Sequence, residues 1–121
     1  MASEKEDLRE RTKRFALQVI RLFSTLPKTT EAQVLGRQVL RSGTSVGANY
    51  REAFRARSEV EFIAKMGDCL KELEETAYWL ELLVESGIRS PEKLASLQEE
   101  TNQLTAIFVT IIKRKKLRIK N

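Results

Sequence analysis

Apolar residues recur along most of this chain at alternating steps of three and four, the spacing that places side chains on one face of an α-helix. Four such series follow one another, separated by short stretches rich in turn-forming residues. They predict helices over residues 4–26, 29–57, 59–86 and 91–115. No stretch shows the period-two alternation of a half-buried strand. The pattern therefore predicts an all-α protein with a long second helix.

Signals for helix starts and ends support these boundaries. Ser58 and Glu61 have the spacing of a capping box before the third helix. Gly87 suits the left-handed position that follows a helix, and Ser90-Pro91 reads as an N-cap followed by proline at the first helical position. Because the connections are short, neighbouring helices should be antiparallel. We expect one up-down-up-down four-helix bundle domain over residues 1–121.

The stretch "LRSGTSVGANYREA", residues 40–53, interrupts this pattern with turn-forming residues. A phosphate-binding loop would need a preceding strand and a Gly-Lys-Ser/Thr signature, and the stretch has neither. A turn between two helices is a stronger alternative. However, the helical phase is kept across the whole segment, which predicts one continuous helix. The in-phase residues are Ala32, Leu35, Val39, Ser42, Val46, Asn49 and Ala53.

Small residues form a second stripe beside this core series. A glycine inside a helix costs about 1 kcal/mol relative to alanine, so close approach of another helix should compensate. That helix could belong to the same chain or to a neighbouring subunit. Two aromatic residues of the third helix also fall outside its main apolar series. The candidate oligomer-interface residues are therefore Gly36, Leu40, Gly43, Gly47, Tyr78 and Trp79.

Three polar residues, Ser45, Asn49 and Glu52, neighbour one another on the same predicted helix. Such a cluster could form hydrogen bonds with the facing helix and fix its register. We interpret it as structural rather than catalytic.

The segment "RSGTSVGANYREA" resembles a known signature, Arg-x-x-x-Ser-Ile-x-x-Asn-Ile-x-Glu-Gly. This signature belongs to the bacterial four-helix bundle family also known as 23S rRNA intervening-sequence proteins. The segment "RARSEVEFIAKMGDCLKELEE" also looks like that family's third helix, and the resemblance covers approximately residues 7–115. Tyr50 replaces the usual aliphatic residue and Ala53 the usual glycine. The matching residues are Arg41, Ser45, Val46, Asn49 and Glu52.

The resemblance implies a bundle that assembles as a ring, typically a homopentamer. Relatives include the accessory variability proteins of diversity-generating retroelements, which are basic pentamers that bind nucleic acid and a reverse transcriptase. Most members of the family have no assigned activity.

Residues that carry chemistry are scarce. The chain has no histidine, the commonest general acid–base group and metal ligand. Its one cysteine, Cys69, lies on an apolar helical face, where a buried thiol is expected. Glu72 and Glu75 are spaced i, i+3 on one helix, but no histidine is present to complete a di-metal motif with them. We therefore expect no catalytic residue, no metal and no cofactor.

The start of the chain is charged and lacks an apolar segment. No run approaches the ~18 apolar residues needed to cross a bilayer. These features favour a cytoplasmic protein that does not contact membranes.

Charge is unevenly distributed in this chain of net charge +5. Residues 58–88 contain eight acidic residues and two lysines, whereas residues 113–121 contain six basic residues and no acid. The second helix also carries an arginine stripe on the side that faces away from the core of the bundle. This stripe consists of Arg37, Arg41, Arg51 and Arg55. It could bind phosphate, pair with acids of the third helix or simply be solvated. The candidate nucleic-acid-binding residues are Arg37, Arg41, Arg51, Arg55, Lys113, Arg114, Lys115, Lys116, Arg118 and Lys120.

Two functional hypotheses follow. The first is a non-catalytic homo-oligomeric scaffold that binds the RNA or DNA backbone through the basic tail and the arginines. Because no aromatic residue interrupts the tail, such binding should tolerate any sequence. The second is an adaptor ring that recruits a protein partner through the acidic third helix or through Tyr78 and Trp79. A basic terminus that serves only solubility is the alternative for the tail.

Overall fold

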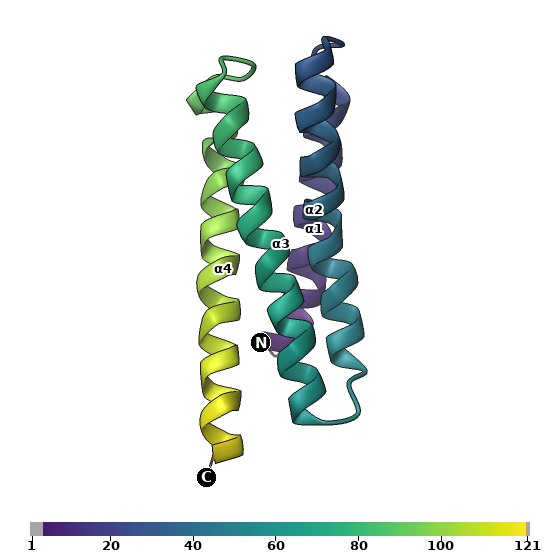
Figure 1. Cartoon of the computed structure of the whole chain (residues 1–121), viewed down its shortest axis with the longest axis vertical. Coiled ribbons are helices and arrows are strands. Elements are labelled where there is room, and N and C mark those ends of the chain that lie inside the picture. The colour runs from purple at the N-terminus through teal and green to yellow at the C-terminus, as the bar shows by residue number, and fades with distance from the viewer. Residues whose placement is uncertain (1–3, 121) are drawn as a thin grey trace.

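The computed structural model describes residues 4–120 (Figure 1). This part of the chain forms four helices and no strand, which confirms the predicted all-α four-helix bundle. The helices are α1 (Glu4–Thr25), α2 (Thr30–Phe54), α3 (Glu59–Glu85) and α4 (Pro91–Lys120).

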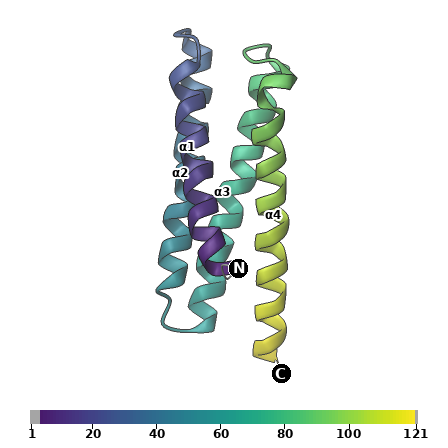
Figure 2. The ribbon, with the colours of Figure 1, turned by 180° about the vertical axis from the view of Figure 1, so that it is seen from behind.

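Successive helices run antiparallel, so the start of α1 and the end of α4 lie toward the same end of the bundle (Figure 1). Helices α2 and α3 pack along each other, with α1 against α2 and α4 against α3. Helices α1 and α4 have the sparsest contact of the four neighbouring pairs. The view from behind shows them separated toward the end where α1 finishes and α4 begins (Figure 2).

The helix ends use the predicted capping residues, with one difference in detail. The Ser58 hydroxyl accepts a hydrogen bond from the Glu61 N–H at 3.0 Å. The Glu61 carboxylate accepts from the Arg57 N–H at 3.1 Å, rather than from the N–H of Ser58 as an ideal capping box would. Gly87 has φ of 79°, the left-handed conformation expected after α3.

Two helices end several residues away from the predicted positions, whereas α1 and α3 each end one residue earlier than predicted. Helix α2 is continuous through residues 42–47, as its unbroken phase predicts, but it ends at Phe54 rather than near residue 57. Helix α4 continues to Lys120, so the predicted basic tail is helical over its described residues; Asn121 lies outside them. Lysine and arginine are good helix formers, and cations are favoured at a helix C-terminus.

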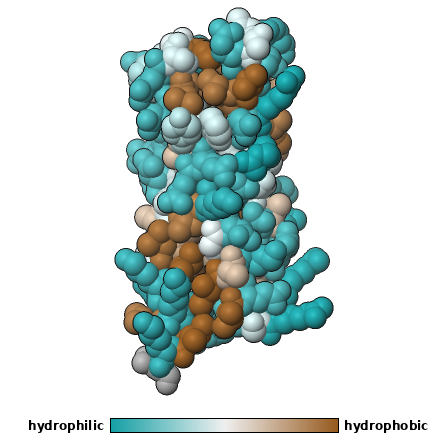
Figure 3. Space-filling view, in the orientation of Figure 1, coloured by the Kyte–Doolittle hydropathy of each residue, from teal (hydrophilic) through white to brown (hydrophobic). Residues whose placement is uncertain are grey.

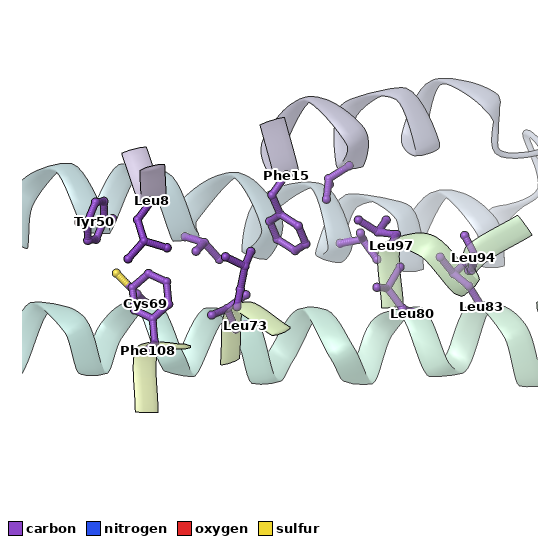
Figure 4. Close-up of a cluster of buried hydrophobic side chains, with 14 of the residues drawn as sticks. Leu8, Phe15, Tyr50, Cys69, Leu73, Leu80, Leu83, Leu94, Leu97 and Phe108 are labelled. Carbon is purple, nitrogen blue, oxygen red and sulfur yellow. The ribbon is translucent and has the colours of Figure 1, made fainter. Parts of the chain in front are cut away.

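The hydrophobic core runs the length of the bundle (Figure 4). Toward one end, Leu8, Tyr50, Cys69 and Phe108 come together from four different helices. Cys69 is fully buried, and its burial raises the pKa of the thiol to about 12. The expected burial of this thiol is therefore confirmed.

The glycines of α2 allow close packing against α1 of the same chain. A Cβ added at Gly43 would lie 2.7 Å from Val19 Cγ2, and one at Gly36 would lie 2.6 Å from Leu26 Cδ1. At Gly47 the nearest side chain also belongs to α1. Of the two interpretations of this stripe, close packing within the chain is the one observed.

Candidate nucleic-acid interface

The arginine stripe of α2 contains one residue that is already paired. Arg41 Nη1 lies 3.2 Å from Glu72 Oε2, and Arg41 Nη2 lies 2.6 Å from Glu75 Oε1. The side chain therefore bridges α2 to the acidic face of α3. For Arg41, the ion-pairing alternative is the one observed.

The other stripe residues, Arg37, Arg51 and Arg55, are exposed. Among the described residues, none of their side chains forms an ion pair or a side-chain hydrogen bond. From the first to the last of them the helix rises about 27 Å. They form a sparse row of cations rather than a cluster.

The basic end of α4, defined as Lys113, Arg114, Lys115, Lys116, Arg118 and Lys120, is denser. Lys115 pairs with Glu59 at 3.2 Å, and its Nζ lies 5.3 Å from the centre of the Phe62 ring. Arg118 lies 3.9 Å from the same carboxylate. The other four cations have no ion pair within residues 4–120. Because the segment is helical, Lys113, Lys116 and Lys120 share one face.

Apolar side chains accompany these cations. Leu117 and Ile119 are 62% and 45% exposed. A cavity of about 260 Å³ beside the basic end is lined by Tyr50, Phe62 and Met66 together with arginines of α4. Sequence reasoning missed this proximity, since no aromatic residue interrupts the basic segment itself. Phe62 comes from a helix some fifty positions earlier in the chain.

A band of hydrophobic surface also runs along the lower half of the face formed by α3 and α4 (Figure 3). Both helices contribute partly buried apolar side chains that pack on the core, including Leu70 and Ile112. Leu40 of α2 is likewise partly buried against the core.

The two aromatic residues predicted for an interface differ in environment. Tyr78 is 53% exposed, whereas Trp79 packs partly against the core. Their ring centres lie 5.1 Å apart. The indole Nε1 of Trp79 is buried without a hydrogen-bond partner among the described residues. Tyr78 is therefore the more accessible of the pair.

The predicted polar cluster of α2 is only partly connected to the facing helix. Glu52 accepts a hydrogen bond from Lys65 of α3 at 2.8 Å. Ser45, by contrast, donates to the Arg41 carbonyl of its own helix at 2.6 Å. Asn49 has no side-chain hydrogen bond within the described part of the chain. Of the three residues, Glu52 is therefore the one whose side chain forms a hydrogen bond with α3 among the described residues.

A buried pair makes the cross-helix contact instead. The hydroxyls of Ser42 and Thr76 lie 2.7 Å apart, and both side chains are fully buried. Both residues fall on the apolar series of their helices, where a polar residue signals a buried hydrogen bond. Their pairing was not visible in the sequence because it depends on the relative register of α2 and α3.

Among the side chains that the structure describes, no group of three or more acidic or cysteine residues is arranged to hold a metal ion. None of the four helices, over the described residues, has a segment that is long and apolar enough to cross a membrane.

Comparison with known proteins decides the family. A model of the family described as 23S rRNA-intervening sequence protein matches residues 4–110, most of the chain. The chain belongs to this family. The match includes Arg41, Ser45, Val46, Asn49 and Glu52, the residues that carry the predicted resemblance. It ends before the basic end of α4 begins.

A solved structure agrees with this assignment to the 23S rRNA-intervening sequence proteins. It is a crystal structure of a protein of unknown function from the S23 ribosomal protein family of Bacteroides thetaiotaomicron. The two chains are 35% identical and superpose with a TM-score of 0.86, over 92% of this chain and 99% of the other. Among curated proteins, no sequence matches this chain.

The two departures from the family signature are both packing positions. Tyr50 is buried, with its ring 5.7 Å from that of Phe108 in an edge-on arrangement. Ala53 is buried as well. The ring of Tyr50 fills one end of the core between α2 and α4. Both changes therefore concern local packing.

Proposed function

We propose that this protein is a non-catalytic, homo-oligomeric scaffold that binds the backbone of RNA or DNA. The observation that carries the proposal is the basic end of α4, where four exposed cations have no ion pair with any described residue. A protein that neutralises phosphates releases condensed counterions, which drives binding without reading sequence. A cytoplasmic location is part of the same proposal.

Helical presentation supports phosphate binding. Lys113, Lys116 and Lys120 form a row of ammonium groups on one face, whereas Arg114 and Arg118 lie on another face of the helix, beside Phe62 and Met66. The guanidinium groups can bind phosphate oxygens through two parallel hydrogen bonds. Assembly into an oligomer, which we propose to be a pentamer, would repeat this surface and strengthen its positive field.

Fluorescence anisotropy with a structured RNA, measured on nuclease-treated protein between 50 and 200 mM salt, tests the proposal. Binding should weaken steeply with salt, because each phosphate contact contributes about −0.9 to the log–log slope on a duplex. Replacing all six bases of the basic end with glutamine should lower affinity and flatten this slope. An unchanged slope would show that the basic end of α4 does not contact the phosphates.

A matched pair of triple variants separates the two basic surfaces. One replaces Lys113, Lys116 and Lys120 with glutamine, and the other replaces Arg37, Arg51 and Arg55. Each removes three exposed cations that lack ion pairs within the described residues. We expect the first variant to have the larger effect on both affinity and slope. The opposite order would place the main contact on α2.

A protein-binding adaptor is the second candidate, favoured by exposed Tyr78 on the acidic helix α3. In that case a defined partner should be captured by the wild-type protein after nuclease treatment. Tyr78→Ala should lose that partner, while binding of RNA should be absent even at 50 mM salt. Retention of the partner only when nucleic acid is intact would reject the adaptor role.

A further inference from the structure

A further basic surface, separate from the α2 arginines, lies at the opposite end of the bundle from the basic end of α4. It is a groove of about 460 Å³ formed where α1 finishes and α4 begins, the region where these two helices separate (Figure 2). That volume lies within the range of typical small-molecule sites, roughly 300–1,000 Å³. The groove is independent of the surface in the proposed function.

Three cationic side chains line this groove, namely Arg21, Arg89 and Lys93, and no carboxylate does. Within residues 4–120, the side chains of Arg21 and Lys93 have no ion pair or hydrogen bond. Three like charges around one groove repel one another unless an anion lies between them. Their arrangement therefore favours an anionic occupant.

Arg89 is held in place by the protein itself. Its guanidinium donates hydrogen bonds to the Thr25 carbonyl at the end of α1 and to the Ile88 carbonyl, the latter at 3.1 Å. An arginine has five N–H donors, so some remain available for a ligand. A cation that is already fixed loses little conformational entropy on binding.

The groove has an apolar floor and a cationic rim. Leu22, Leu94 and Leu97 form the floor, and the three cations form the rim. Gln18 adds an amide that has no hydrogen-bond partner in the described part of the chain. An occupant should then combine a strongly anionic group with a less polar portion. Free inorganic phosphate would use only the rim.

We propose that this groove binds a phosphorylated small molecule. Its phosphate groups contact Arg21, Lys93 and the free donors of Arg89, and its organic portion lies on the leucine floor. Arginine and lysine are well suited to phosphate oxygens, and the absence of a lining carboxylate removes competition for them.

Isothermal titration calorimetry on the full chain at low ionic strength tests this site with inorganic pyrophosphate and with ADP. The double variant Arg21→Gln/Lys93→Gln should bind pyrophosphate at least about tenfold more weakly than wild type, because two charge-assisted contacts are lost. Arg89 is left intact because it supports the end of α1. Circular dichroism confirms that the variant remains folded.

Two controls separate this site from general charge. Lys28→Gln/Lys71→Gln removes the same charge from exposed positions outside the groove and should change affinity less than twofold. The six-glutamine variant of the basic end of α4 should behave likewise, so loss of RNA binding and loss of pyrophosphate binding are distinguishable. Equal binding by the Arg21/Lys93 variant and wild type would overturn the proposal, as would absence of binding by wild type.

ADP tests the leucine floor. It should bind several-fold more tightly than pyrophosphate, since its nucleoside adds apolar contact. Equal affinities would overturn the assignment of the floor to an organic portion.

Discussion

Gly43 and Gly67 both lie inside helices, but their surroundings are opposite. A Cβ at Gly43 would lie 2.7 Å from Val19, whereas a Cβ at Gly67 would meet nothing within 4 Å. Gly43→Ala should therefore destabilise the protein by about 1–3 kcal/mol through overpacking. Gly67→Ala should stabilise it by up to about 1 kcal/mol through helix propensity. Urea unfolding of the matched pair measures both; a Gly43→Ala variant as stable as wild type would contradict the close packing.

The thiol of Cys69 gives a pH-dependent prediction. Its folded-state pKa is raised to about 12 from an ordinary value of 9.0 because the group is buried. Below pH 9 both states keep the proton, so the contribution to stability is constant. Between pH 9 and 12 the unfolded state loses its proton first, so stability falls as pH rises. Cys69→Ala should lack this part of the decline when urea unfolding is compared across that range.

Individual side chains also show where sequence reasoning stops. Burial of Cys69 was predictable, since its place in the apolar series depends on local spacing alone. Whether Arg41 binds a ligand or pairs with α3 was not, because both outcomes use the same exposed stripe. The answer depends on Glu72 and Glu75 lying opposite it, which is a property of helix register.

At the scale of elements, the continuity of α2 was predictable and the length of α4 was not. The helical phase of the apolar residues passes unbroken through residues 42–47. This periodicity predicts one helix in spite of the glycines in the segment. After Ile111 the apolar series of α4 is replaced by basic residues, which read as a tail. The helix nevertheless continues to Lys120, since its residues have high helix propensity and favourable charge for a C-terminus.

The helical state of this segment is open to test at Leu117, which is 62% exposed and lies among the bases. Leu117→Pro should break the last turns, because proline removes a backbone donor and clashes with the preceding turn. RNA affinity should then fall several-fold with little change in the melting temperature of the bundle. Leu117→Ala, which keeps the helix, serves as the control. Equal RNA affinity of the two variants would show that helical presentation is unimportant.

At the scale of the whole molecule, the fold leaves Tyr78 and the hydrophobic band on α3 and α4 uncovered (Figure 3). We predict that these surfaces mediate self-association. Light scattering coupled to size-exclusion chromatography should give a mass about five times the 13.9 kDa of one chain. Tyr78→Glu should shift the protein toward the monomer by placing a charge in the contact. Ala95→Glu, at an exposed position of α4, should not. A monomeric wild type would reject the ring.

Self-association and RNA binding should be coupled through valency. Several basic ends held on one particle raise the effective concentration of the second contact once the first has formed, without any new interaction. A monomeric Tyr78→Glu variant should therefore bind a long structured RNA at least about tenfold more weakly than wild type. On an RNA too short to reach two basic ends, the two proteins should bind equally. Anisotropy with both lengths separates these cases: equal loss on short and long RNA would mean that Tyr78 itself contacts the nucleic acid.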